Sequence, residues 1–342
     1  MKNFLSRLFV LGAALGLAFI SGPEEASAQD MRFTQYNAIP TAVNPAYAGI
    51  TDRARLTSIY RNQWSGMPNG FIGYHVGYDF YNRDAHSGFG VLFSKEAAGA
   101  GALSTTRIAI QYAFDANFGN GWSFRPAMQL GGANRSVDMG RLIFGDQLIR
   151  EDESGSLEGP IGASNSYLDF AAGGLLLGPQ MWLGYSVDHL NTPNASLYEG
   201  YTELLAQKHS VHGGFRMDIG KNNPKVHSDA DFVMAFNYMK HGIFDQMDVG
   251  AYYDLKPISV GLWWRGLPIG HTIEGGHDVD ALSFIIGYGT SDWQLGYSYD
   301  ITVSTLGLST TGGSHEIVLR CGWDHDRRNR PVVPRAVPCV TF

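Results

Sequence analysis

The chain has 342 residues, of which only 17% are charged, and its net charge is -7. Soluble globular proteins carry roughly 25% charged residues, so the composition is unlike that of a typical soluble enzyme. The negative balance, without a basic tract, excludes nucleic acid as an expected partner. Beyond the N-terminus no apolar run is long enough for a membrane-spanning helix, which excludes a bundle of such helices.

The N-terminus predicts export from the cytoplasm. Lys2 and Arg7 form a short basic region, residues 8–20 are an apolar run, and Ala26-Ser27-Ala28 supplies the small residues of a cleavage site. This order is that of a secretory signal peptide. We therefore expect residues 1–28 to be removed and the mature chain to begin at Gln29.

Past residue 50 the sequence alternates with a period of two. In residues 293–301, Trp, Leu, Tyr, Tyr and Ile alternate with Gln, Gly, Ser and Asp. Side chains of a strand point to opposite faces, so each such segment has one apolar and one polar face. The polar face holds Gly and short polar residues, and the apolar face holds bulky aromatics. This pattern favours a transmembrane antiparallel β-barrel with lipid outside and a confined lumen inside.

The alternation predicts fourteen strands, with twelve or sixteen as alternatives. We expect the barrel over residues 54–323 and a C-terminal periplasmic tail over 324–342. Even strand numbers, short periplasmic turns and long external loops are typical of such barrels, and the longest connections lie at about 134–165 and 190–208. Both ends of the chain are then expected in the periplasm. The predicted strands are 54–64, 71–82, 86–95, 103–115, 122–133, 166–177, 180–189, 209–220, 229–240, 244–255, 258–267, 279–290, 293–303 and 313–323.

Residues 29–53 precede the first predicted strand and do not alternate. Pro40 and Pro45 interrupt any strand there, and Asn44-Pro45 followed by small residues and Gly49 indicates a turn. The segment also contains three aromatic residues, which are poorly solvated unless they are packed. We expect this segment to pack against the barrel lumen or against a periplasmic partner.

Both ends of the mature chain resemble one known family. The run Gln29-Asp30, Phe33-Thr34-Gln35-Tyr36, Pro40 and Asn44-Pro45-Ala46-Tyr47-Ala48-Gly49, followed by Tyr60-Arg61-Asn62-Gln63-Trp64, resembles the opening of the PorP/SprF family. The ending Pro338-Cys339-Val340-Thr341-Phe342 is similar to the family's Pro-Cys-Pro-x-Phe, with Val340 in place of the second Pro.

The resemblance implies an outer-membrane barrel of the type IX secretion system of Bacteroidetes. It predicts a non-enzymatic component that assists export or surface attachment of a partner protein, with outer-membrane lipid, other secretion components and a secreted or surface-anchored client as partners. The alternative is a passive or ligand-selective porin. The residues expected to contact a partner or the lumen are Gln35, Tyr36, Pro40, Asn44, Pro45, Ala46, Gly49, Arg61, Gln63, Trp64, Pro338, Cys339 and Phe342.

A third alternative, an outer-membrane hydrolase, needs inward polar side chains within hydrogen-bond reach of each other. Charged residues that face the lumen more often pair with one another, so we expect no catalysis, no cofactor and no metal site. Cys321 is expected to point toward lipid, and its pairing with Cys339 is left open. The inward candidates by parity are His75, Asp79, Arg107, Asp169, His212, Arg216, Asp218, Asp248, Asp254, Arg265, Glu316 and Arg320.

Overall fold

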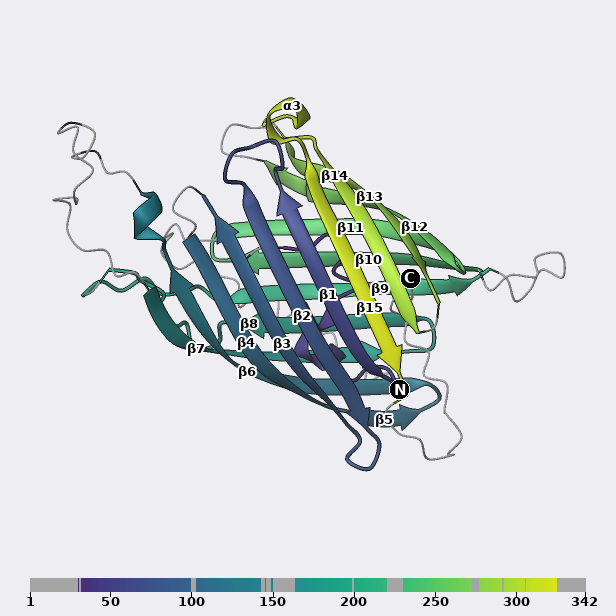
Figure 1. The fold of residues 1–342 in the computed structure, drawn as a ribbon. Coiled ribbons are helices and arrows are strands. Elements are labelled where there is room, and N and C mark those ends of the chain that lie inside the picture. The colour runs from purple at the N-terminus through teal and green to yellow at the C-terminus, as the bar shows by residue number, and fades with distance from the viewer. Residues whose placement is uncertain are drawn as a thin grey trace.

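A computed structural model shows almost the whole mature chain as one antiparallel sheet that closes on itself (Figure 1). The structure describes residue 30 and residues 32–324, apart from 100–102, 143–144, 146–148, 150–163, 199, 220–229, 272–276, 291 and 305. Within these residues no helix is long and apolar enough to cross a membrane.

The elements follow the predicted order along the chain. Short helices are η1 (Pro40–Ala42), η2 (Pro45–Tyr47), η3 (Met139–Arg141) and α3 (Leu308–Thr311). The strands are β1 (Ala54–Gln63), β2 (Phe71–Asn82), β3 (Ser87–Ala98), β4 (Leu103–Phe114), β5 (Ala116–Gly119), β6 (Trp122–Ser136), β7 (Ser164–Leu177), β8 (Met181–Asp188), β9 (Lys208–Asp218), β10 (Ala230–His241), β11 (Phe244–Leu255), β12 (Ile258–His271), β13 (His277–Gly289), β14 (Trp293–Thr302) and β15 (Ser314–Trp323).

Strands that are neighbours in the chain pair antiparallel, except β4 and β5, and β1 pairs with β15 to close the barrel. The short β5 continues the course of β4 after a break at Asp115, since both pair with β6. When β4 and β5 are taken as one strand, the barrel has the fourteen strands that the alternation predicts.

The two faces of the barrel wall divide as predicted. Large apolar side chains, among them Ile108, Ile110 and Met128, stand exposed on the outside. The inside is polar, and it is buried rather than open to solvent. Buried there are the predicted inward residues His75, Asp79, Asp169, His212, Asp248, Asp254, Arg265, Glu316 and Arg320.

The connections differ between the two ends of the barrel, which we call the short-turn end and the long-loop end. Connections at the short-turn end include 83–86, 120–121, 178–180 and 256–257. The long-loop end carries 137–163 and 189–207, together with 303–313. In outer-membrane barrels the longer loops usually face the outside of the cell.

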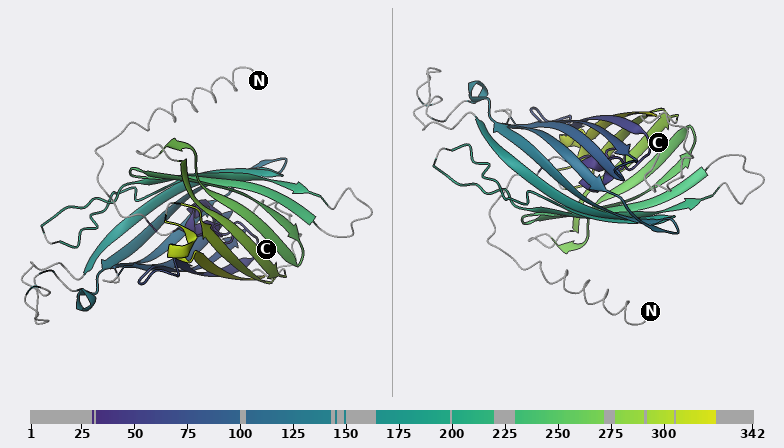
Figure 2. Two further views of the ribbon diagram at one scale, coloured as in Figure 1. Left: turned by 90° about the horizontal axis from the view of Figure 1, so that it is seen from above. Right: turned by 90° about the horizontal axis from the view of Figure 1, so that it is seen from below.

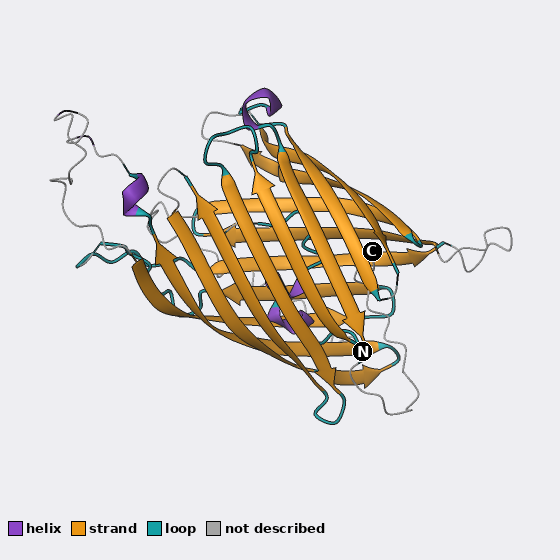
Figure 3. Cartoon of the chain, in the orientation of Figure 1, coloured by secondary structure: helices purple, strands orange, loops and turns teal. Residues whose placement is uncertain are grey.

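The lumen is occupied by residues 30–53, which we call the N-terminal segment. Figure 2 shows this purple stretch between the strands in views from above and from below, and Figure 3 shows its two short helices inside. Its residues 34–41 and 44–50 are buried. The core cluster of the molecule therefore lies between Tyr36, Ile39, Tyr47 and Ile50 of this segment and apolar side chains of the inner wall.

Candidate functional site

The first contact that fixes the N-terminal segment is the Thr34 clamp, formed by Thr34, Gln35, Arg61, Asp300 and Glu316. The Glu316 carboxylate accepts the backbone N–H groups of Thr34 (2.9 Å) and Gln35 (2.7 Å). The Arg61 guanidinium donates to Thr34 Oγ1 (2.7 Å), Asp300 (2.8 Å) and Glu316 (3.1 Å). All five residues are buried or nearly so. A buried ion pair is stable only when such additional hydrogen bonds satisfy its charged groups.

Tyr36, next along the segment, packs edge-on against Trp263 of β12, with ring centroids 5.0 Å apart. Trp263 also contacts Tyr252 of β11, at 5.5 Å. Burial, with the nearby Asp248 carboxylate, raises the pKa of Tyr36 well above its usual value. The phenol therefore stays neutral, and the aromatic group adds apolar packing to the polar clamp beside it.

Asn44 anchors the middle of the segment. Its side-chain carbonyl accepts the backbone N–H of Ala46 (2.9 Å), which caps η2, and Pro45 occupies the first helical position, where no N–H is required. The Asn44 amide donates to the backbone carbonyls of Gly174 in β7 (3.1 Å) and Tyr185 in β8 (3.2 Å). One side chain thus shapes the turn predicted from Asn-Pro and fastens it to the wall.

Glycines of the inner wall leave room for the segment. A Cβ atom at Gly173 would overlap the Asn44 side chain, and one at Gly296 would overlap the Gln35 amide. Glycine is the only residue that allows so close an approach to the strand backbone. The glycine-rich inner face therefore reflects the docked segment as well as the confined space of a barrel.

The segment leaves the lumen near the short-turn end. Arg125 of β6, fully buried, donates to the backbone carbonyls of Ala46 (3.0 Å) and Ala48 (2.5 Å). Asp79 of β2 accepts the backbone N–H of Gly49 (2.8 Å). Because β2, β6, β8 and β14 lie at different places around the barrel, these contacts show that the segment spans the lumen from wall to wall.

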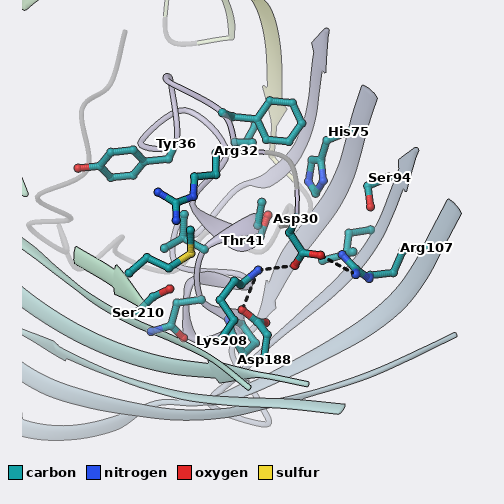
Figure 4. Close-up of a pocket in the computed structure, with 18 of the residues that line it drawn as sticks. Asp30, Arg32, Tyr36, Thr41, His75, Ser94, Arg107, Asp188, Lys208 and Ser210 are labelled. Atoms are coloured by element: carbon teal, nitrogen blue, oxygen red, sulfur yellow. Dashed lines mark hydrogen bonds and ion pairs between the residues drawn. The ribbon is translucent and has the colours of Figure 1, made fainter. Parts of the chain in front are cut away.

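The start of the described segment lies toward the opposite end. The Asp30 carboxylate contacts Lys208 Nζ (2.9 Å), His189 Nε2 (3.1 Å) and Arg107 Nη2 (3.3 Å), as Figure 4 shows in part. Lys208 begins β9 at the long-loop end. Asp30 therefore lies toward the long-loop end, whereas β1 begins and β15 ends at the short-turn end, and the periplasmic location of the two ends of the chain stays a prediction.

Asp169 and His189 form the kind of acid–imidazole pair that a hydrolase needs, with Nδ1 2.9 Å from the carboxylate. The other nitrogen of His189 faces Asp30, so both ring nitrogens meet carboxylates and both must donate. Burial alone would lower the pKa of His189, but Asp30 and Asp169 raise it to about 9. This imidazolium has no free nitrogen to accept a proton, so its role is to hold charge.

The raised pKa of His189 predicts a dependence of stability on pH. Protonated His189 stabilises the folded state fully below the ordinary value of 6.5, and this contribution is lost as the pH rises through about 9. We expect urea unfolding in detergent micelles to show falling stability over this interval. His189→Asn should reduce this dependence of unfolding free energy on pH. Equal slopes of unfolding free energy against pH for the two proteins would contradict a charged His189.

Most of the residues predicted from the family-like motifs meet within the lumen. Arg61 and Gln35 join in the Thr34 clamp, Gln63 Oε1 accepts from Arg61 Nε at 3.4 Å, and Pro40 begins η1. Trp64 lies apart, at the long-loop end, against Phe71 (5.2 Å). Pro338, Cys339 and Phe342 are outside the described residues, so the pairing of Cys321 with Cys339 stays open.

Sequence reasoning missed several residues that hold the segment, namely Arg125, His189, Lys208 and Asp300. Arg125 and Asp300 lie on the inner face and are buried, so strict parity along β6 and β14 could have placed both. Lys208 and His189 border a long connection, and outside a strand alternation does not predict which way a side chain points. No pattern in the sequence pairs any of them with residues 30–49.

A comparison with curated protein sequences finds no match. Several solved outer-membrane barrels are similar in structure. The toluene transporter TodX of P. putida aligns with a TM-score of 0.47 at 8% identity, covering 83% of this chain and 93% of its own. Omp33 of Acinetobacter baumannii aligns with a TM-score of 0.43 at 8% identity, covering 80% and 99%. Likeness at this level says nothing about function.

The family comparison is more specific, and it agrees with the motifs at the start of the mature chain. The model of the type IX secretion system membrane protein PorP/SprF matches residues 25–321, which is most of the sequence. This protein therefore belongs to the PorP/SprF family of type IX secretion system membrane proteins.

Proposed function

We propose that this protein, exported by a cleaved signal peptide, assists the export or surface attachment of a partner protein, and that it acts by binding rather than by catalysis. Family membership links the protein to the type IX secretion system. The finer proposal, binding rather than catalysis, rests on what the inner wall of the barrel contacts. Its buried charges hold the chain's own N-terminal segment, so the lumen is built as a rigid, filled support.

The passive porin is the competing function. A porin needs a continuous polar path through the lumen, with wall charges that face water. Here Arg61, Arg125 and Glu316 are almost fully buried against residues of the segment. These contacts favour a membrane anchor over a path for solutes.

The long-loop end offers a surface for a partner. In the connection 189–207, Tyr198 and Tyr201 stand 52% and 73% exposed, with their rings 6.1 Å apart, and Leu204 is 53% exposed. Tyrosines supply much of the binding energy of protein interfaces, because the ring buries apolar area while the hydroxyl stays hydrogen-bonded. We propose this loop as a contact for the secreted client, and the short-turn end as the side that meets the machinery.

Site-specific photocrosslinking in living cells tests this proposal. A photoreactive residue at Tyr201 should yield a crosslink to a secreted or surface protein, and one at Asn120, an exposed turn residue at the short-turn end, should capture a secretion component. The control is Ile110, which is 56% exposed on the lipid-facing wall and should capture neither. If mass spectrometry finds no secretion component and no client from Tyr201 or Asn120, the proposal fails.

A further inference from the structure

Three cationic groups of the barrel wall converge on a single carboxylate of the N-terminal segment. Lys208, His189 and Arg107 lie 2.9, 3.1 and 3.3 Å from the Asp30 oxygens. They come from the start of β9, the loop after β8, and β4. Since none of the three belongs to the segment, the wall itself sets the positions of these groups.

The wall also carries carboxylates of its own at this place. Asp169 is shared by His189 (2.9 Å) and Arg107 (3.5 Å), Asp188 pairs with Lys208 (3.2 Å), and the charge of Glu96 in β3 also acts on Arg107. The Asp30 carboxylate lies within 3.3 Å of all three cations. Hydrogen bonds between charged partners are stronger than neutral ones, so this arrangement of donors favours a carboxylate as its ligand.

Asp30 is also the main attachment of the start of the segment. Of the described residues 30, 32 and 33, only Asp30 makes a hydrogen bond or ion pair with the wall. Arg32 has buried Nε and Nη1 atoms without hydrogen-bond partners, and burial lowers its pKa to about 10. Phe33 touches only the edge of the His75 ring, at 6.1 Å between centroids. Beyond these residues the Thr34 clamp holds the chain independently.

Space for a ligand adjoins the three cations. A cavity of about 120 Å³ is lined by Asp30, Arg32, Lys208 and Asp188, among others. In Figure 4 the Arg32 guanidinium lies beside this cavity, on the side away from Arg107. A volume of this size exceeds that of a single water site. It lies toward the long-loop end, where Lys208 begins its strand.

We propose that Arg107, His189 and Lys208 form a carboxylate-binding site of the barrel wall, which Asp30 occupies as a tethered ligand. When the start of the N-terminal segment withdraws, the site accepts the aspartyl side chain of a partner peptide that enters from the long-loop end. The geometry matches this ligand, because an aspartate already fills the site. The inference stands apart from the proposed function, since its test needs no secretion component.

Chemical rescue of Asp30→Gly tests the carboxylate site. We expect this variant to unfold at a lower temperature in detergent micelles than the wild type. Sodium acetate should restore most of the loss, whereas acetamide and sodium chloride of equal ionic strength should not. Asp138→Gly, at an exposed loop residue that pairs with Arg141 and accepts the N–H of Gly140, is the control and should show no response to acetate.

If Asp30→Gly does not fold in the cell, its refolding yield from urea into micelles is measured with acetate and with acetamide, and equal yields overturn the proposal. A variant lacking residues 30–33, which keeps the Thr34 clamp, tests the peptide ligand. A blocked Ala-Asp-Ala peptide should raise its unfolding temperature, and blocked Ala-Asn-Ala should not. Equal effects of acetate and acetamide, or of the two peptides, would show that no carboxylate site exists.

Discussion

Arg61→Ala should lower the free energy of unfolding of the barrel by about 3–5 kcal/mol, the usual cost of removing one partner of a buried ion pair. The guanidinium bridges Thr34, Asp300 and Glu316. Without it, two buried carboxylates remain near each other with Arg265 as the nearest cation to Asp300 (3.5 Å), and one of the contacts that hold Thr34 is lost. Urea unfolding in detergent micelles, followed by tryptophan fluorescence, measures the change.

A matched arginine shows whether the loss comes from the clamp. Arg141 pairs with Asp138 at the surface, and its side chain is 63% exposed, so Arg141→Ala should change stability by less than about 0.5 kcal/mol. Arg61→Lys keeps the charge but not the planar fork that reaches several acceptors at once, so it should fall between the two. A loss for Arg61→Ala no larger than that for Arg141→Ala would refute the clamp.

Deletion of residues 30–49 should convert the protein into an open channel. The deleted residues span the lumen from the Asp30 site to Gly49 and fill the space between opposite parts of the wall. Removing them leaves an inner face lined with charges and glycines, which water and ions can enter. In planar bilayers we expect the intact protein to show no steady current and the deletion variant to show defined conductance steps.

The same planar-bilayer recording allows a control with a peptide. A synthetic peptide of residues 30–53, added to the deletion variant, should reduce the current, and a scrambled peptide of the same composition should not. Steady conduction by the intact protein, similar to that of the variant, would instead support the porin alternative and contradict the proposal that the segment closes the lumen.

The strands could be predicted from the sequence because one face of each strand meets lipid and the other does not. The differences are at strand ends. The fifth predicted strand, for example, ends at residue 133, whereas the matching strand β6 continues through Asn134, Arg135 and Ser136. Beyond the apolar band both faces are polar, so alternation disappears while the hydrogen-bond ladder continues.

The site was much harder to predict, because its contacts are non-local. Thr34 and Asp300 are 266 positions apart in the chain, and no period or motif joins them. The Asn44-Pro45 turn was visible from local residue preferences, and Arg61 was placed inward by parity. What parity could not show is that the glycines facing the lumen, such as Gly173 and Gly296, mark the path of the segment.

The position of the N-terminal segment also bears on the order in which parts of the protein fold. Residues 30–53 are synthesised before any strand, yet two partners of Thr34, Asp300 and Glu316, lie in β14 and β15, which are synthesised last. Contacts of such large sequence separation form late, because the intervening chain must first be ordered. We therefore expect the part of the barrel that is synthesised first to dock last. Until it docks, its aromatic residues Phe33, Tyr36 and Tyr47 lack their ring contacts with the wall.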